Sequence, residues 1–371
     1  MSRLSVVVTG AEGFIGRNLI LKMSAEGGFD IRPIVRQSTA DQLAAALEGA
    51  DFVIHLAGVN RPREAAEFAI GNHHATELLI AAIEASGCAM PVAFASTSRA
   101  SEDTPYGRSK KAAEDALMAY SARTGAAVHL LRLTNVFGKW SRPNYNSAVA
   151  TFCHNIARSL PITVNDPTAP LALIYIDDVV DALIDLAVRR PDRSGLLETG
   201  PVYSTTVGEV ASLIQQFHAD RADGLIESVG VGLTRALYAT YVAALPTDRF
   251  SYPVVAHTDP RGSFVEMLKT RTSGQFSYFT AHPGVTRGGH YHHTKTEKFL
   301  VLCGEAHFRF RHMISGEVHE VRTSGAEPMI VETIPGWTHD ITNSGNDTLV
   351  VMLWANEIFD RDRPDTIAEK V

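Results

Sequence analysis

The sequence has few cysteines and no long apolar run. Its 371 residues include three cysteines, Cys88, Cys153 and Cys303, and no two of them form a Cys-x-x-Cys pair. So sparse and odd a number argues against a disulfide framework and favours a reducing compartment, so we expect a cytoplasmic protein. No apolar segment approaches the ~18 residues of a membrane span, and the first residues lack the shape of a signal peptide. The sequence therefore predicts no membrane partner.

An excess of basic residues is also missing. The chain has 34 Lys and Arg against 41 Asp and Glu, which gives a net charge of −7 and a pI near 6.1. Nucleic-acid phosphates favour basic surfaces, so the charge argues against a nucleic-acid partner. An anionic small molecule can still bind to local arginines or to a helix N-terminus. The length is enough for two domains, each with its own core.

Strands alternate with helices in the N-terminal part of the sequence. Apolar runs predict strands over residues 4–10, 31–35, 51–57, 91–95 and 127–133. Helical patterns fall between them, over residues up to about 24 and over 40–49, 65–86 and 106–124. This alternation predicts an α/β doubly wound fold of the Rossmann type with a parallel sheet.

The pattern changes from about Ala256 onward. Short apolar runs separated by Gly and Pro turns lie at residues 263–269, 275–280, 298–302, 307–311, 329–333 and 348–354. Such spacing predicts an all-β antiparallel barrel or jelly roll. The Pro-rich, polar segment 245–260 separates the two patterns, so we predict one domain over residues 1–250 and another over 251–371.

A glycine-rich turn follows the first predicted strand. The segment TGAEGFIG holds Gly10, Gly13 and Gly16, with Phe14 and Ile15 between the last two. Glycines let a backbone turn tightly and approach a pyrophosphate, which then lies at the N-terminus of the next helix. The strand, turn and helix context favours dinucleotide binding over a purely structural turn.

Tyr106 and Lys110 form a Tyr-x-x-x-Lys pair near the start of a predicted helix. Residues four apart share one helix face, so the Lys110 ammonium is expected to lower the Tyr106 pKa. Tyr106 is then suited to give a proton to the alkoxide formed when hydride reaches a ketone. Lys110 would also hold the nicotinamide ribose, and Thr97, at the end of the preceding strand, is placed to bind the carbonyl oxygen.

These residues resemble the extended short-chain dehydrogenase/reductase family over roughly residues 1–245. The segment HLAG at 55–58 resembles the loop beneath the cofactor, which implies cofactor contacts from Leu56, Ala57 and Gly58. Asn72 matches the asparagine that organises the catalytic helix. The segment RLTNVFG at 132–138 resembles the strand that ends at the sugar-nucleotide pocket, with Asn135 facing the substrate.

Arg36 follows the second predicted strand, where an NAD enzyme usually places an acid for the ribose hydroxyl. An arginine there suits the 2′-phosphate of NADP(H). The alternative is a solvated surface arginine.

The loop WSRPNYNS at residues 140–147 combines aromatic residues with Arg142, Asn144 and Asn146. Such a loop can stack a uracil and hold a diphosphate. An ordinary Pro/Asn turn is the alternative.

A metal-binding pattern lies far downstream, in the predicted barrel. His290 and His292 are two apart, so on a strand both side chains point to one face. Glu297 follows after a short turn, and His339 lies on a later segment. Three imidazoles and one carboxylate suit a divalent metal, most of all zinc, with nickel, iron or manganese as alternatives. The spacing resembles the two motifs of the cupin family.

The two halves together resemble a family of bifunctional capsular-polysaccharide enzymes. Segments such as NVFGKWSRPNYNS, HHTKTEKFLV and MLWANEIFD carry this resemblance. It implies a homodimer whose cupin epimerises carbon 3 of a UDP-linked 4-keto-6-deoxy-HexNAc. The reductase domain would then reduce carbon 4 with NADPH to give UDP-2-acetamido-2,6-dideoxy-L-talose, on the route to UDP-L-FucNAc for capsular or O-antigen polysaccharide.

Two alternatives keep the same folds. In one, a nucleotide-sugar reductase carries a cupin that serves only for dimerisation or sugar binding, and the metal is structural. In the other, the first domain is an NAD-dependent 4-epimerase or dehydratase, which would need no net NADPH. Arg36 weighs against the second alternative.

Overall fold

A computed structural model describes residues 3–371 apart from 223, 227, 255, 260–261, 266–268, 271–273 and 358–361. The chain divides into two compact units. Unit 1 comprises Met1–Phe137 with Leu171–Ser204, and unit 2 comprises Gly138–Pro170 with Thr205–Val371. The chain therefore passes between the units three times. None of the described helices has the length and apolar character needed to cross a membrane.

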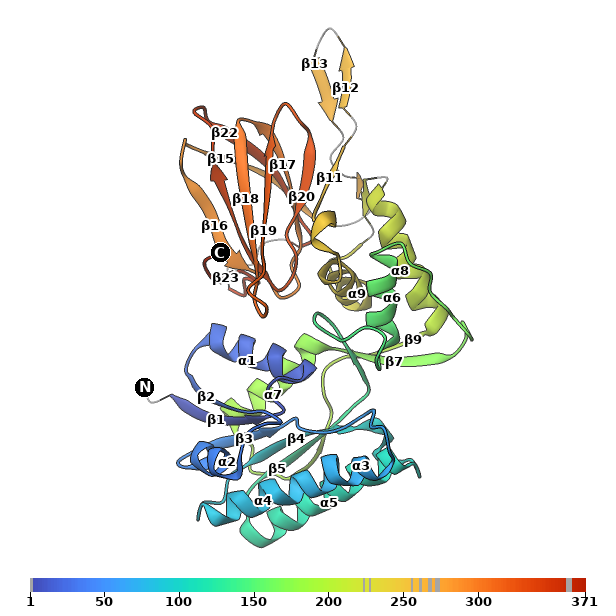
Figure 1. The fold of residues 1–371 in the computed structure, drawn as a ribbon, viewed down its shortest axis with the longest axis vertical. Helices are drawn as coiled ribbons and strands as arrows, with labels where there is room; N and C mark the ends of the chain where they lie inside the picture. The colour runs from blue at the N-terminus through green and yellow to red at the C-terminus, as the bar shows by residue number, and fades with distance from the viewer. Residues whose placement is uncertain are drawn as a thin grey trace. The chain divides into compact units, whose positions relative to one another are not determined.

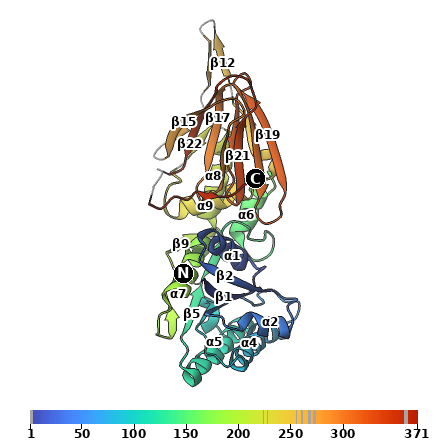
Figure 2. The same cartoon turned by 90° about the vertical axis from the view of Figure 1, so that its left-hand side faces the viewer.

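Unit 1 is built on a six-stranded sheet in the order β2-β1-β3-β4-β5-β8, with every neighbouring pair parallel. Its strands are β1 (Leu4–Thr9), β2 (Phe29–Ile34), β3 (Phe52–His55), β4 (Val92–Thr97), β5 (Val128–Leu133) and β8 (Gly195–Leu197). Helices cover both faces of the sheet (Figures 1 and 2). This arrangement confirms the predicted doubly wound fold.

The helices of unit 1 pack in two layers. On one face lie α1 (Phe14–Glu26) and α7 (Ile176–Arg189), and on the other lie α2 (Ala40–Leu47), α4 (Ala75–Ala85) and α5 (Pro105–Thr124). The core between the sheet and the second layer includes Val53, Phe94 and Val128 from the strands and Leu79 and Leu117 from the helices. A small separate sheet contains β6 (Asn135–Phe137), β7 (Pro170–Tyr175) and β9 (Val202–Thr206).

The helix expected over residues 65–86 contains a local irregularity. Helix α3 (Ala66–Phe68) leads into a π-helical segment, Ala69–His74, and this segment leads into α4. A π-helical turn widens the backbone by one residue and is frequent at functional sites. Asn72 lies within it and is buried.

Among its described residues, unit 2 contains three α-helices, a short 3-10 helix (Thr247–Arg249) and two five-stranded sheets. The α-helices are α6 (Ala148–Ile156), α8 (Val207–Ala222) and α9 (Gly232–Ala243). One sheet has the order β11-β20-β17-β22-β15, and the other has the order β19-β18-β21-β16-β23. Their strands are β11 (Ser251–Pro253), β15 (Gln275–Ala281), β16 (Thr286–Tyr291), β17 (Glu297–Cys303), β18 (Glu305–His312), β19 (Val318–Ser324), β20 (Met329–Glu332), β21 (Trp337–Asn343), β22 (Leu349–Ala355) and β23 (Ile367–Ala368).

All strand pairs in these two sheets are antiparallel, as predicted for a jelly roll. Strands of both sheets are visible in Figure 2. Trp354, Val351, Ile330 and Phe310 are among the residues that fill the interior. Strands β19 and β21 are absent from the predicted apolar runs because polar and charged residues interrupt VHEVRTS and WTHDITN.

Unit 2 also contains two short pairs of strands outside the two five-stranded sheets. Strands β12 (Ala256–Asp259) and β13 (Gly262–Val265) form a hairpin, and β10 (Leu225–Ile226) pairs with β14 (Lys269–Thr270). The strand expected over 263–269 corresponds to β13, and its residues 266–268 lie outside the described residues. The boundary between residues 250 and 251 stays a prediction.

Candidate functional site: a glycine turn and a Tyr/Lys pair in unit 1, and a His/Glu cluster in the barrel

The glycine turn after β1 leaves no space for side chains. A Cβ at Gly10, where φ is 68°, would lie 2.7 Å from the backbone nitrogen of Ala57. A Cβ at Gly16 would lie 2.4 Å from the carbonyl oxygen of Gly10. Only glycine therefore fits at these two positions, which lets the turn take the tight path of a dinucleotide-binding loop.

Helix α1 begins beside this turn. Gly13 is its N-cap, and Phe14 and Ile15 are its first residues, so their unpaired backbone N–H groups face the turn. Arg36 is exposed two residues beyond β2, and the carbonyl of Ile34 in that strand accepts a hydrogen bond from Ala11 at 3.2 Å. The structure thus brings Arg36 to the same edge of the sheet as the glycine turn.

The loop after β3 is fixed against β1 and the π-helical segment. The backbone N–H groups of Leu56 and Ala57 donate to the carbonyl and the hydroxyl of Thr9, both at 3.2 Å. A Cβ at Gly58 would lie 2.9 Å from the Asn72 side-chain oxygen and 3.7 Å from Lys110 Nζ. Leu56, Ala57 and Gly58 therefore form one wall of the predicted cofactor site.

The buried amide of Asn72 connects this loop to helix α5. Its oxygen accepts from Val59 N at 2.8 Å, and its nitrogen donates to Val59 O at 3.0 Å and to Ser109 Oγ at 2.9 Å. Ser109 Oγ in turn donates to the carbonyl oxygen of Tyr106. The π-helical turn places Asn72 where it can make all of these bonds.

Tyr106 lies in the first turn of α5, which Thr104 caps by accepting from Gly107 N at 3.0 Å. Burial raises the Tyr106 pKa, and a hydrogen bond with Thr97 and the charge of Arg99 only partly oppose it. The expected lowering by Lys110 is therefore wrong for this structure, because burial outweighs every neighbouring group. The phenol stays protonated at neutral pH, and Thr97 is next to it as predicted.

Lys110 is buried one turn after Tyr106. Its ammonium donates to the carbonyl oxygen of Ala95 at 2.8 Å and lies 4.1 Å from the centre of the Phe94 ring. Burial lowers the Lys110 pKa to about 7, although the charge of Glu114 opposes the shift. A buried amine that titrates near neutrality is typical of functional sites.

The expected substrate residues lie on two segments. Asn135 is exposed at the start of β6 in unit 1 and donates to the carbonyl of Ala172 at 3.1 Å. Arg142, Asn144 and Asn146 lie in the loop before α6 in unit 2. The Arg142 guanidinium lies 5.1 Å from the Tyr145 ring centre, and the Asn144 backbone has a φ of 53°. The backbone of this loop is thus partly left-handed, a conformation that proteins often keep at functional sites.

Trp140 fixes the same loop to the barrel. Its φ is 67°, and its indole N–H donates to His312 Nε2 at 3.0 Å. A Cβ at Gly336 would lie 2.6 Å from the Trp140 ring, so only glycine fits there. The N–H of Gly336 donates to the carbonyl of His292. Gly336 therefore contacts the Trp140 indole on one side and the predicted metal ligand His292 on the other.

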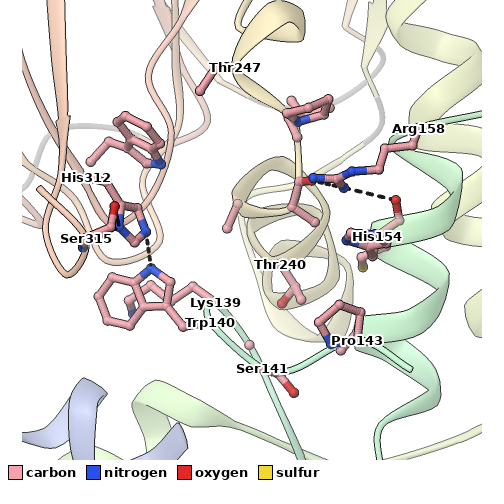
Figure 3. A pocket seen from close by; sticks show the side chains of 18 of the residues that line it. Lys139, Trp140, Ser141, Pro143, His154, Arg158, Thr240, Thr247, His312 and Ser315 are labelled. Atoms are coloured by element: carbon pink, nitrogen blue, oxygen red, sulfur yellow. Dashed lines mark hydrogen bonds between the residues drawn. The ribbon is translucent and has the colours of Figure 1, made fainter. Parts of the chain in front are cut away.

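A cavity of about 430 Å³ lies beside Trp140 in unit 2 (Figure 3). The loop, α6, α9 and the end of the barrel line it with residues that include Lys139, His154, Arg158, Thr240 and Trp337. The Arg158 guanidinium donates to the carbonyls of His154 and Ala244. Within the described part of the chain, the lining includes none of the four predicted metal ligands.

The four predicted metal ligands converge inside the barrel. One ligand atom from each of His290, His292, Glu297 and His339 lies within 4.8 Å of the others. His290 in β16 is directly opposite His339 in β21, next to an irregularity of pairing at Gly288. Glu297 begins β17 in the other sheet. Strand pairing therefore brings together residues that are up to 49 positions apart.

The contacts within the cluster are short. His292 Nε2 lies 3.1 Å from the Glu297 carboxylate, and His339 Nε2 lies 3.7 Å from it. The His290 and His339 ring centres are 4.6 Å apart. Lys295 Nζ lies 2.8 Å from the other oxygen of Glu297. His293, which directly follows His292, is not in this group of four.

The charges of the cluster balance each other. Burial opposes ionisation of Glu297, but His292 and Lys295 outweigh it and hold the Glu297 pKa well below its usual range. Burial also opposes the charged form of His292, yet Glu297 and Asp365 raise its pKa. Burial, His339 and His292 lower the His290 pKa to about 3. The site thus holds a carboxylate and at least one neutral imidazole, which are the forms that bind metals.

The donor set fits a divalent metal ion. Both ring nitrogens of His339 are buried and lack a hydrogen-bond partner in the described part of the chain. Buried polar atoms are rarely left unpaired, so these nitrogens point to a missing ligand. Three imidazole nitrogens and one carboxylate oxygen are typical of zinc and similar metals.

Sequence reasoning missed the residues that support the cluster. Thr333 fixes the start of β17, because its hydroxyl accepts from Glu297 N at 2.9 Å. Asp365 binds the turn between His292 and Glu297. Neither position belongs to a recognisable motif, so only the folded chain reveals them.

Comparisons with known proteins agree with this geometry. Residues 6–197 match the family described as NAD dependent epimerase/dehydratase, and residues 257–367 match the polysaccharide biosynthesis C-terminal domain. The chain belongs to the NAD dependent epimerase/dehydratase family. Membership of this family supports a nicotinamide cofactor at the glycine turn.

Relatives of this epimerase/dehydratase family member span its whole length. The UDP-2-acetamido-2,6-beta-L-arabino-hexul-4-ose reductase of Pseudomonas aeruginosa is 53% identical over 98% of both chains. The crystal structure of the capsular polysaccharide assembling protein CapF from Staphylococcus aureus is 38% identical over 99% of both chains, with a TM-score of 0.68. MoeE5 in complex with UDP-glucose and NAD is 27% identical, covers 59% of this chain and 82% of its own, and has a TM-score of 0.52. The whole chain is thus similar to nucleotide-sugar enzymes of polysaccharide biosynthesis.

The glycine turn gives a first prediction. In Gly16→Ala the new methyl group meets the Gly10 carbonyl, which should cost about 1–3 kcal/mol of stability and weaken dinucleotide binding about tenfold or more. Gly27→Ala is the matched control, because Gly27 has a φ of 73° but open space around it. The control should lose stability without losing affinity. Fluorescence titration with a reduced nicotinamide dinucleotide measures the affinity, and urea unfolding measures the stability. Unchanged affinity in a folded Gly16→Ala protein would contradict the role of the turn.

Lys110 gives a prediction about pH. Because its pKa falls from 10.5 to about 7 on folding, the unfolded chain binds more protons between these values, and stability from this group rises with pH across that window. Lys110→Met should therefore stabilise the cofactor-free protein by about 1–4 kcal/mol at pH 7, with a smaller gain at pH 9.5. Urea unfolding at both pH values measures this.

The neighbouring Lys111 serves as the control for Lys110. Its exposed ammonium pairs with Asp115, so Lys111→Met should change stability by less than about 1 kcal/mol at either pH. A gain for Lys110→Met that does not shrink at pH 9.5 would show that the buried charge is not its cause.

Proposed function

We propose that the protein is a bifunctional nucleotide-sugar enzyme. The barrel epimerises carbon 3 of a UDP-linked 4-keto-6-deoxy-HexNAc, and unit 1 then reduces carbon 4 with NADPH. The product is UDP-2-acetamido-2,6-dideoxy-L-talose, for capsular or O-antigen polysaccharide. The observation that carries this proposal is the presence of a Tyr106–Thr97–Lys110 site and a four-residue His/Glu cluster in one chain.

The name of the Pseudomonas relative supports the reductive step. That protein is a reductase of a UDP-linked hexul-4-ose, a sugar with a ketone at carbon 4. Reduction of such a ketone needs a hydride at carbon 4 and a proton at its oxygen. The reduced nicotinamide supplies the hydride when it is bound at the glycine turn.

Tyr106 and Thr97 act on the ketone oxygen at carbon 4. Thr97 donates a hydrogen bond to the carbonyl and holds it beside the phenol, and Tyr106 transfers its proton to the oxygen as carbon 4 becomes an alcohol. Burial raises the Tyr106 pKa, so the phenol carries the proton that this step requires. Lys110 orients the cofactor ribose, and Arg36 pairs with the 2′-phosphate that distinguishes NADPH.

The barrel carries out the epimerisation at carbon 3. The C–H at carbon 3 is next to the ketone, so its proton can be removed and returned on the opposite face. A divalent metal, zinc in our proposal, would be held by His290, His292, Glu297 and His339 and would polarise the ketone. Lys295 brings a further proton-carrying group to the cluster, since its ammonium is 2.8 Å from Glu297. Tyr291 alternates with His290 and His292 along the chain and faces away from them.

Product stereochemistry distinguishes this proposal from the alternative in which the barrel only binds sugar or joins subunits. A non-catalytic barrel leaves carbon 3 unchanged, with or without metal. NMR of the product formed from the 4-keto sugar and NADPH, before and after chelation, decides between the two. The homodimer that the resemblance implies stays a prediction.

The first test separates the two activities. Tyr106→Phe should reduce NADPH oxidation by about 10²–10⁴-fold, the usual contribution of a general acid, and leave solvent-deuterium exchange at carbon 3 intact. Both rates can be measured on the same substrate. Loss of both together would refute the division between the two sites.

The second test addresses the cluster. His290→Ala should remove bound metal and abolish exchange at carbon 3, because one of four ligands is lost. His293→Ala is the matched control, since His293 is adjacent but outside the cluster, and it should keep both. Metal analysis and deuterium exchange are the measurements, and unchanged exchange in a metal-free variant would rule out the metal-assisted mechanism.

A further inference from the structure

The C-terminal segment lies against β16, the strand that carries the predicted metal ligand His290 and ends just before His292. Strand β23 pairs with β16, with Ala368 opposite His290 and Ile367 opposite Tyr291. Asp365 precedes this short strand and contacts residues about 70 positions earlier in the chain. The segment after the last barrel strand is therefore positioned at the cluster, although it contributes no ligand.

The Asp365 carboxylate binds three consecutive backbone N–H groups. It accepts from His293 N at 2.8 Å and from Thr294 N and Lys295 N at 2.7 Å. It also accepts from the Thr294 hydroxyl at 3.0 Å. Successive N–H groups that converge on one anion form a concave nest with a fixed backbone shape. Here the nest is the turn between His292 and Glu297, so the carboxylate sets how the chain passes from one ligand to the next.

The backbone carbonyl of Asp365 acts on His292 itself. It accepts a hydrogen bond from His292 Nδ1. The hydrogen must then be on Nδ1, which leaves the lone pair of Nε2 directed at Glu297 and the centre of the cluster. Contacts of this kind orient ligating histidines, and their loss lowers metal affinity about 10–100-fold.

We infer that Asp365 is the positioning residue of the His290/His292/Glu297/His339 centre, and that the C-terminal segment is part of that centre. Its side chain fixes the ligand-bearing turn, and its carbonyl fixes the tautomer of His292. This inference rests on the proposed metal site, and it adds that the affinity of the site depends on a residue that binds no metal.

The test is metal affinity in solution, with the full chain and Co²⁺ or Zn²⁺ in competition with a chromophoric chelator. Asp365→Ala should bind the ion about 10–100-fold more weakly than the natural chain. Asp365→Asn retains one acceptor oxygen and should have an intermediate affinity. Glu369→Gln is the matched control, because Glu369 lies in the same segment but its side chain pairs with Arg311, away from the turn. The metal affinity of this variant should equal that of the natural chain.

Two further measurements separate positioning from general stability. Far-UV circular dichroism and a cooperative urea transition like that of the natural chain should be retained in every Asp365 variant, and they show that the whole chain, barrel included, is folded. The Co²⁺ absorption spectrum at saturation should change in Asp365→Ala, which a purely structural role would not cause. If Asp365→Ala does not fold, the comparison of Asp365→Asn with Glu369→Gln decides.

The outcomes distinguish the inference from the proposed function. Equal affinities and equal spectra in the natural chain and the Asp365 variants would overturn the inference and leave the metal site standing. Absence of binding by the natural chain would overturn both. A graded loss of affinity in the order natural chain, Asp365→Asn, Asp365→Ala, with the fold intact, would support it.

Discussion

The hydrogen bonds of the buried Asn72 side chain are the interactions on which the proposed reductase site depends. Its amide bonds both backbone groups of Val59 and the hydroxyl of Ser109, so it joins the loop beneath the cofactor to the helix that carries Tyr106 and Lys110. A second chain of bonds runs from the Asn72 carbonyl through Thr76 and His55 to Thr9 at the end of β1. Burial lowers the His55 pKa to about 3, so this link is neutral and does not titrate near pH 7. Glycine turn, cofactor loop and catalytic helix thus share one buried polar network.

The two sites use different means to prepare for their ligands. In unit 1 the backbone forms most of the predicted cofactor site, through glycines that exclude side chains and helix N–H groups that remain unpaired. In the barrel, side chains form the predicted metal site, and strand pairing determines which of them lie close together. Each site carries a cost in the absence of its ligand, a buried ammonium at Lys110 and unpaired imidazole nitrogens at His339. Such costs are expected where structure is kept for function rather than for stability.

Local pattern was enough to predict the fold class and the grouping of the four predicted metal ligands, because strand alternation, glycine spacing and His-x-His spacing are short-range signals. Three things were not accessible in this way. The Tyr106 pKa depends on burial, which spacing does not reveal. Strands β19 and β21 carry polar residues on one face and lack a continuous apolar run. Asp365 and Trp140 act through contacts about 70 and 170 positions away. Positions that depend on tertiary contacts therefore escaped the sequence, whereas the grouping of residues within motifs did not.

The contact between Trp140 and Gly336 has a consequence for how this chain could be divided or recombined. The indole occupies space that the barrel leaves open at a glycine, and His312 satisfies its N–H. A gene fragment that ends before the barrel would leave this large ring and its left-handed backbone without support. A barrel transplanted onto another reductase would in turn carry an empty notch at Gly336. Residues 138–147 therefore belong with the barrel in unit 2, and exchange between homologues must keep this loop together with the barrel that it fits.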